Sequence, residues 1–176
     1  MPESNGTGGW MIFDNTVLSN FAITERLSLL HTLYSSRACT TLMVVEEIWR
    51  GLEAGYTDLQ PLENILKPLS ATGWMEVLDL DSDIEQSLYL KLLSTLDSGE
   101  AACLALAVER NMTLASDDLA VRRAAARMGE KLTGTLGILL RAVRDEVMPL
   151  KAANDILGQM IAQRYRSPVE RLDDLL

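Results

Sequence analysis

Short apolar runs alternate with longer helical segments along this chain, and that alternation restricts the fold more than any other feature. Met11–Phe13 and Met112–Ala115 suit buried strands, and Trp74–Leu80 alternates apolar with acidic residues, as a half-exposed strand does. Strands that alternate with helices predict a parallel sheet covered by helices. The expected fold class is therefore α/β, with three α/β/α layers around a central, mainly parallel sheet.

The other elements are assigned from helical spacing and from turn residues. Residues 41–45 are either a strand edge or the entry to a helix, and residues 131–133 form a last short strand. Asn15 and Thr16 are expected to cap the first helix, and Gly129 to close the helix that passes through Arg127. One expected helix begins at Val17, and another runs from Glu46 to near Gly51 or Gly55. Further helices are expected over 24–35, 61–67, 83–95, 100–110, 134–143 and 152–164.

The chain length of 176 residues fits one domain, and a hydrophobic content of 48% allows a large core. We expect a flexible N-terminal extension over 1–10, a main domain over 11–148, and a C-terminal helical extension over 149–176 that packs on the domain or on a partner. The sequence has no apolar run long enough for a membrane span, and its polar, Gly-rich start is unlike a signal peptide. A cytoplasmic location is therefore expected.

Acidic side chains follow several of the apolar runs, in four separate segments. Asp14 and the pair Asp117-Asp118 come directly after strands, whereas Glu47 and Glu100 fall in the first turns of helices. The carboxyl ends of parallel strands meet at one edge of a sheet, and ligands bind beyond that edge. The four segments are therefore expected to converge on one acidic pocket. Its carboxylate oxygens are the ligands that Mg²⁺ prefers, and the lone His31 makes a zinc site improbable.

A divalent cation in such a pocket would act on a phosphodiester. It would polarise the phosphate, neutralise developing charge and generate hydroxide from a bound water. We expect direct ligation by Asp14 first and by Asp118 or Asp117 second. Glu47 and Glu100 would bind the metal through water or orient the nucleophile. The sequence leaves open whether one metal ion or two are bound.

Hydroxyl and guanidinium groups flank these acids. Thr16 and Ser116 either hold a carboxylate or phosphate oxygen or act as plain helix caps. Arg122 and Arg123 follow Asp118 on one expected helix, where they either guide an RNA backbone or form a solvated face. The net charge of −9 argues against a generic nucleic-acid-coating role, because such proteins need cations to replace the counterions around phosphates. It remains compatible with a nuclease whose acids bind metal.

Taken in order, the four acidic segments resemble the motifs of the PIN domain, the nuclease fold of VapC-like toxin ribonucleases in toxin–antitoxin modules. MIFDNTVLSNF resembles the opening strand and its Asp, and VVEEIWRG resembles a Glu-[Leu/Ile]-x-x-Gly element whose spacing selects Glu47 rather than Glu46. DSGEAACLALA and ASDDLAVRRAA, with GTLGILLRA, are similar to the GEA and GTLG motifs of one predicted prokaryotic branch. The resemblance runs from about Met11 to Val143.

The resemblance implies an Mg²⁺- or Mn²⁺-dependent endoribonuclease, often a homodimer and often a toxin neutralised by a cognate antitoxin. Its implied catalytic residues are Asp14, Glu47, Glu100, Asp118 and Asp117, and its implied metal ligands are Asp14, Asp118, Asp117 and Glu100. Which member of the Asp117-Asp118 pair faces the pocket stays open at this point. The Ser/Thr-x-Asp form of the motif favours Asp118 through Ser116, whereas other members favour the first of the pair.

Two alternative functions compete with the nuclease. A catalytically silent PIN-like scaffold would bind RNA or a protein partner without cutting, although a scaffold has no need for four mutually repelling carboxylates. A phosphatase of the haloacid-dehalogenase kind opens with Asp-x-Asp, but Thr16 stands here at the position of the second acid. Metal-dependent turnover would separate the nuclease from the scaffold.

Overall fold

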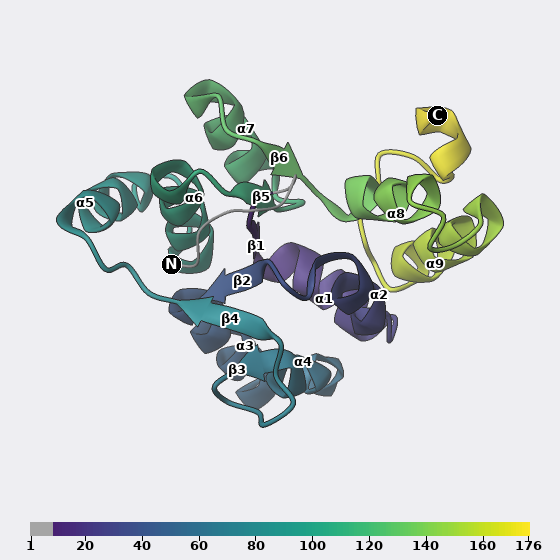
Figure 1. The fold of residues 1–176 in the computed structure, drawn as a ribbon, viewed down its shortest axis with the longest axis horizontal. Helices are drawn as coiled ribbons and strands as arrows, with labels where there is room; N and C mark the ends of the chain where they lie inside the picture. Colours follow the sequence, from purple (N-terminus) through teal and green to yellow (C-terminus); the bar gives the residue numbers. More distant parts are fainter. Residues whose placement is uncertain (1–8) are drawn as a thin grey trace.

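The computed structural model describes residues 9–176, and its centre is a six-stranded sheet in which every paired strand is parallel (Figure 1). The strands are β1 (Met11–Phe13), β2 (Ala38–Thr41), β3 (Leu66–Lys67), β4 (Met75–Leu78), β5 (Thr113–Ala115) and β6 (Leu132–Thr133). Their order across the sheet is β3-β4-β2-β1-β5-β6. The α/β fold class expected from the sequence is confirmed. The expected flexible extension over residues 1–10 falls, up to residue 8, outside the described residues.

Helices follow most of the strands, and two short 3₁₀ segments complete the chain. The helices are α1 (Asn15–Ile23), α2 (Leu27–Tyr34), α3 (Leu42–Glu53), α4 (Pro61–Ile65), α5 (Asp83–Leu92), α6 (Ser98–Arg110), α7 (Leu119–Met128), α8 (Thr135–Arg144) and α9 (Leu150–Ala162), with 3₁₀ turns at Thr57–Leu59 and Leu172–Leu175. No helix within residues 9–176 is both long and apolar enough to cross a membrane.

Two of the expected assignments were wrong for local reasons, and a third, left open between a strand edge and a helix entry, is a helix entry for residues 42–45. The cap of α1 is Asp14, whose side chain accepts a hydrogen bond from the Asn15 backbone N–H, rather than Asn15 or Thr16. Residues 61–67 are not all helical, because Leu66–Lys67 pairs with β4 as a strand and the following Pro68 disfavours helical backbone at Lys67. Residues 42–45 belong to α3, and the strand before them is β2.

β1 is enclosed on both faces of the sheet. Ile12 and Phe13 project to opposite faces, and both side chains are fully buried, so helices cover both faces here. The alanine-rich α6 packs close to the strands, because its residues from Ala101 to Ala107 are all buried and mostly small. The Cys103 Sγ lies 3.7 Å from the Phe13 carbonyl oxygen. This close packing brings the start of α6 to the end of β1.

The strand order reverses direction beside β1. After β1 the chain builds β2, β3 and β4 on one side, and only later adds β5 and β6 on the other. Ligands of open parallel sheets bind at the carboxyl ends of strands where such a reversal occurs. Asp14 follows β1 and Ser116 follows β5, so the sequence segments that carry the acids meet at this point.

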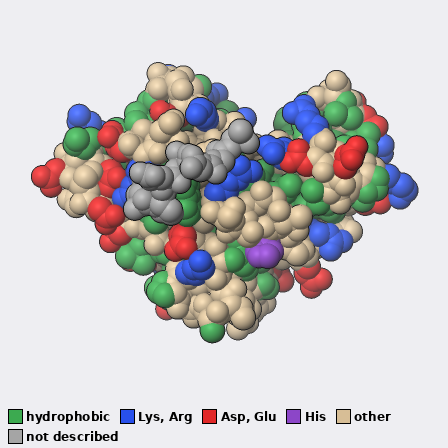
Figure 2. Space-filling view, viewed as in Figure 1, with side chains coloured by type: hydrophobic (Ala, Val, Ile, Leu, Met, Phe, Trp, Pro, Cys, Tyr) green, Lys and Arg blue, Asp and Glu red, His purple; other side chains and the backbone are tan. Residues whose placement is uncertain are grey.

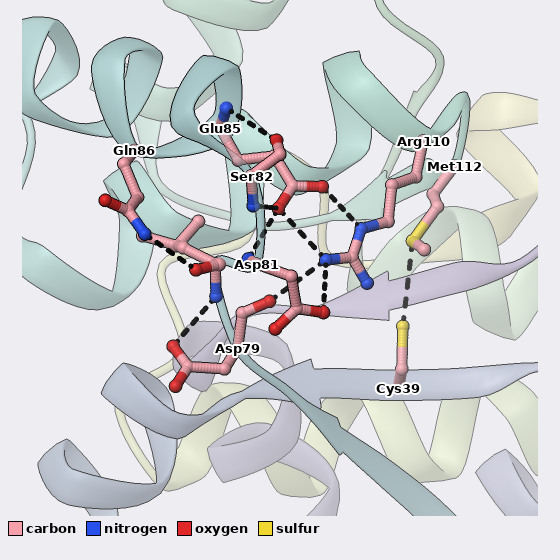
Figure 3. Close-up of polar contacts among 9 residues, drawn as sticks. Cys39, Asp79, Asp81, Ser82, Glu85, Gln86, Arg110 and Met112 are labelled. Atoms are coloured by element: carbon pink, nitrogen blue, oxygen red, sulfur yellow. Dashed lines mark hydrogen bonds and ion pairs between the residues drawn. The ribbon is translucent and has the colours of Figure 1, made fainter.

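An ion-pair network joins α5 to α6 (Figure 3). Arg110 Nε donates to Glu85 Oε1 at 2.7 Å, and Arg110 Nη2 lies 3.2 Å from Asp81 Oδ2. Ser82 caps α5, and Glu85 completes a capping box with it. We call Arg110, Glu85 and Asp81 the Arg110 cluster. The acidic segment 79–85 thus contains the start of α5 and supplies partners for Arg110.

Candidate active site

Asp14 is a buried carboxylate surrounded by neutral donors. Its side chain is 1% exposed. Oδ1 accepts a hydrogen bond from Asn15 N at 2.7 Å, and Oδ2 accepts from Ser116 Oγ at 2.8 Å and from Thr16 Oγ1 at 3.1 Å. Burial raises the pKa of Asp14 to about 6, although these three hydrogen bonds act in the opposite direction. Within residues 9–176, no Lys or Arg forms an ion pair with it.

Glu47 reaches from α3 to the first turn of α6. Its Oε1 accepts a hydrogen bond from Gly99 N at 2.8 Å, at a helix N-terminus that favours negative charge. A Cβ at Gly99 would lie 2.6 Å from that same oxygen, so the glycine of the GEA motif makes room for the carboxylate. Burial raises the pKa of Glu47 to about 7, and the negative charges of Asp97 and Asp14 act in the same direction.

Glu100 lies on the same turn of α6 and is tied to Asp97. The two residues form a capping box, in which Glu100 N donates to Asp97 Oδ1 at 3.0 Å and Asp97 N donates to Glu100 Oε2 at 3.1 Å. Burial raises the pKa of Glu100 to about 7, helped by the charges of Asp97, Asp118 and Asp14. Asp97 therefore belongs to the acidic site, although it was not among the site residues expected from the sequence. The signal was the Asp-x-x-Glu spacing of a capping box.

Asp117 and Asp118 have different surroundings. Asp117 uses both oxygens at the start of α8, where Oδ1 accepts from Thr135 N at 2.9 Å and Oδ2 accepts from the Thr135 hydroxyl and from Asn20 Nδ2. A Cβ at Gly134 would lie 2.5 Å from Asp117 Oδ1, which gives the GTLG motif a steric reason. Asp118 caps α7 through Oδ1 alone, and its Oδ2 forms no hydrogen bond within the described part of the chain.

The flanking hydroxyls connect the acidic segments to one another. The Ser116 side chain is fully buried, donates to Asp14 and accepts from Asp118 N at 3.2 Å. The Thr16 hydroxyl donates to Asp14 and accepts from Asp117 N at 3.0 Å. In this conformation Ser116 contacts other site residues and not solvent, whereas Thr16 also reaches the surface groove described below.

The two expected arginines do not behave alike. Arg122 Nη1 donates to the Ser116 carbonyl at 3.0 Å and to the Thr133 carbonyl at 3.3 Å, so it joins the ends of β5 and β6. Arg123, the next residue of α7, is exposed and has no ion pair among residues 9–176.

An open groove of about 570 Å³ lies beside these acids, and we call it the Asp118 groove. It is lined by Thr16, Asn20, Asp117, Asp118, Leu119, Arg164, Tyr165 and Arg166. Glu47 and Glu100 are not among its lining residues. Asn20 and the segment 164–166 were missed by the sequence analysis. Asn20 lies one helical turn after Thr16, which was a usable signal, whereas the C-terminal segment gave none.

The donor chemistry of the site fits a hard divalent cation. All of its candidate ligands are carboxylate oxygens, and burial and mutual repulsion raise the pKa values of Asp14, Glu47 and Glu100. Within residues 9–176, no set of three or more His, Cys, Asp and Glu side chains is arranged so that it could hold a metal ion. Mg²⁺ needs no such set, because proteins commonly hold it with one or two carboxylates plus waters and substrate phosphates.

Comparison with known proteins identifies the family of this chain. No curated protein matches the chain. The crystal structure of PAE2754 from Pyrobaculum aerophilum is similar to it at a TM-score of 0.43 and 14% sequence identity, over 70% of this chain and 98% of that one. A family model described as PIN domain matches residues 10–176, which is nearly the whole chain. The chain therefore belongs to the PIN domain family, whose members are generally nucleases.

Proposed function

We propose that this protein is an Mg²⁺- or Mn²⁺-dependent endoribonuclease that hydrolyses RNA phosphodiester bonds. The observation that supports the proposal most is the Asp14 carboxylate, which is 1% exposed yet has no cation of its own among residues 9–176. Three neutral donors fix its orientation at the carboxyl end of the central strand. A buried carboxylate arranged in this way favours the arrival of a cation.

The proposed ligands follow from the burial and the hydrogen bonds of each carboxylate. Asp14 and Asp118 would hold the metal, since Asp118 keeps Oδ2 available. Asp117 would position α8 instead, because its hydrogen bonds to Thr135 and Asn20 join the start of α8 to α1. Glu100 would bind through water. When bound, the cation would polarise the scissile phosphate and activate a water molecule.

The remaining residues would orient groups and move protons. Ser116 and Thr16 would hold Asp14 in one rotamer through their hydroxyl groups. Glu47 and Glu100 have pKa values raised to about 7, so each is suited to accept the proton of an attacking water near neutral pH. From the family resemblance alone, we also propose that the protein is a toxin component, works as a homodimer and has a cognate antitoxin.

Cleavage of an RNA pool by the purified protein tests this proposal. The pool contains structured and single-stranded RNAs and is incubated with Mg²⁺, with Mn²⁺ or with a chelator. We expect metal-dependent cutting that Asp14→Asn abolishes. Asp155→Asn is the matched control, because Asp155 is exposed on α9 and pairs only with Lys151. Metal binding without cutting in any condition would support the silent scaffold in place of the nuclease.

A further inference from the structure

The chain returns to the acidic site after α9 and adds two guanidinium groups to it. Arg164 and Arg166 line the Asp118 groove together with Asp117 and Asp118. Between the two arginines, the Tyr165 hydroxyl lies 3.5 Å from Asp117 Oδ1 and donates toward it. None of the acidic motifs includes this segment.

The turn that carries the arginines is fixed by its backbone. Arg164 N donates to the Ile161 carbonyl and Tyr165 N donates to the Met160 carbonyl, both at 3.0 Å. This bond pair is the Schellman arrangement that ends many helices, in which a glycine usually occupies the left-handed position. Arg164 occupies it here with φ 75°. The segment is therefore held in one conformation beside the groove, and an arginine stands where the backbone would favour glycine.

The charges of Arg164 and Arg166 are not used elsewhere in the described structure. Both residues are exposed, and neither forms an ion pair among residues 9–176, in contrast to Arg110, Arg141 and Arg171. A guanidinium presents a planar fork of N–H donors that matches the oxygens of a phosphate. Two such guanidinium groups beside the acids are therefore suited to bind an anion.

The overall charge of the protein makes local cations important. The chain carries a net charge of −9, and on the face shown in Figure 2 the Lys and Arg side chains are interspersed with Asp and Glu. RNA that approaches the acidic site would therefore meet repulsion unless cations lie directly beside it. Arg122 is engaged with the carbonyls of Ser116 and Thr133. Arg164 and Arg166 are the arginines that line the groove itself.

We propose that Arg164 and Arg166 each bind a backbone phosphate of the RNA substrate and so hold the strand along the Asp118 groove. The inference rests on the proposed ribonuclease function for the identity of that strand. Tyr165 acts as a positioning residue, because its hydroxyl connects the C-terminal turn to Asp117.

Binding of a short fluorescent single-stranded RNA, measured with chelator present, tests the proposal apart from catalysis. Wild type, Arg164→Gly, Arg166→Gln and the double variant are compared over a range of salt concentrations. Each single variant should weaken binding about tenfold, the scale of one charge-assisted hydrogen bond. Each should also reduce the slope of log K against log salt by about 0.7, as expected for one lost single-strand phosphate contact. Arg127→Gln, an exposed arginine on α7 outside the groove, should change neither quantity.

Arg164→Gly separates lost contact from lost folding. Glycine adopts the left-handed backbone of this position without strain, so the variant should melt at a higher temperature than wild type while binding RNA more weakly. Unchanged affinity and salt slope in both single variants, or no RNA binding by wild type, would overturn the inference. Metal-dependent cleavage together with unchanged RNA binding by the arginine variants would overturn the inference but agree with the proposed nuclease function. Weaker binding by the variants without any cleavage would leave the phosphate contact standing and contradict the nuclease.

Discussion

Two buried carboxylates in this protein have opposite electrostatic surroundings. Glu85 is 5% exposed and Asp14 is 1% exposed, so both are removed from water. Glu85 has Arg110 Nε at 2.7 Å, and the hydrogen bond to this guanidinium lowers the pKa of Glu85 to about 2 (Figure 3). Asp14 has only neutral donors, and burial raises its pKa to about 6.

The difference teaches how a buried acid is used. A carboxylate that is buried beside its own cation is electrostatically complete, and the Arg110 cluster accordingly links α5 to α6. A carboxylate that is buried without one retains an unbalanced charge, which an external cation can neutralise. Residue type and burial are shared by the two positions. The two positions differ in the presence or absence of a cation among the described residues, and we propose that this difference separates a structural from a functional role.

The largest expected effect comes from removing the cation of the Arg110 cluster. Arg110→Met should lower the free energy of unfolding by about 3–5 kcal/mol, because it leaves the buried charge of Glu85 without its guanidinium partner. Urea denaturation measures this change. Arg141→Gln, which removes the exposed pair with Asp145, is the matched control and should cost less than about 1 kcal/mol. Equal losses in the two variants would remove the basis of the comparison.

Neutralising Asp14 should stabilise the protein rather than destabilise it. In metal-free buffer at neutral pH, Asp14→Asn should raise the free energy of unfolding by about 2 kcal/mol. The rise in the pKa of Asp14 from 3.8 to about 6 sets the scale, at about 1.4 kcal/mol per pKa unit, and altered hydrogen bonds to Ser116 and Thr16 reduce the gain. Asp155→Asn should leave the stability unchanged. A less stable Asp14→Asn would mean that the carboxylate is already satisfied in the folded chain.

The two clusters should also titrate in separate pH windows. Asp14, Glu47 and Glu100 have raised pKa values, so the folded state binds more protons, and metal-free stability should fall as pH rises from about 4 to about 7. The pKa of Glu85 is lowered from 4.5 to about 2, so its contribution should be lost as pH falls through that range.

Urea denaturation midpoints measured from low to neutral pH follow both changes in stability. Asp14→Asn should reduce the fall in stability above pH 4, and Arg110→Met should reduce the loss of stability below it. A metal-free wild type whose stability does not change between about pH 4 and pH 7 would contradict the raised pKa values of the site.

The smallest expected effect concerns two helical glycines. Gly99→Ala should lower stability by about 1 kcal/mol and reduce cleavage, because its Cβ would lie 2.6 Å from Glu47 Oε1 and displace that carboxylate. Gly158→Ala should raise stability by about 0.5–1 kcal/mol, since nothing lies within 4 Å of its Cβ and alanine is the better helix former. Thermal melting and RNA cleavage assays of the two variants test whether the Glu47 carboxylate must stay at its position beside the first turn of α6. Identical behaviour of the two variants would show that it does not.

The sequence predicted the elements whose signals are local. β1 and β5 are apolar runs that end at acids, and helix spacing identified α6 and α7 to within a few residues. Parallel topology also predicted that the Asp14 and Asp117-Asp118 segments lie close together, and hydrogen bonds through Ser116 and Thr16 join them. The sequence did not predict β3, because only its pairing with β4 makes a strand of two residues there. It also could not choose between Asp117 and Asp118, since that choice depends on contacts with Thr135 and Asn20 far along the chain.

The C-terminal arginines escaped prediction for a related reason. Nothing in the local sequence around Arg164 indicates an acidic partner. Its place depends on α9, which packs against α8 and α1 and buries Ile156, Leu157 and Met160. Figure 1 shows α8 and α9 together at the right of the view, next to α1 and α2, with the C-terminal segment continuing from α9.

Binding of Mn²⁺ to the protein alone tests the central claim most directly. Wild type and Asp14→Asn are melted at neutral pH across a range of Mn²⁺ concentrations, without RNA. If the site takes its missing cation from solution, Mn²⁺ should stabilise wild type by about 2.7 kcal/mol at a concentration one hundred times its dissociation constant. Asp14→Asn should lose most of that increment, and Arg110→Met should keep it. Equal stabilisation of wild type and Asp14→Asn, or none in either, would contradict the claim that Asp14 awaits an external cation.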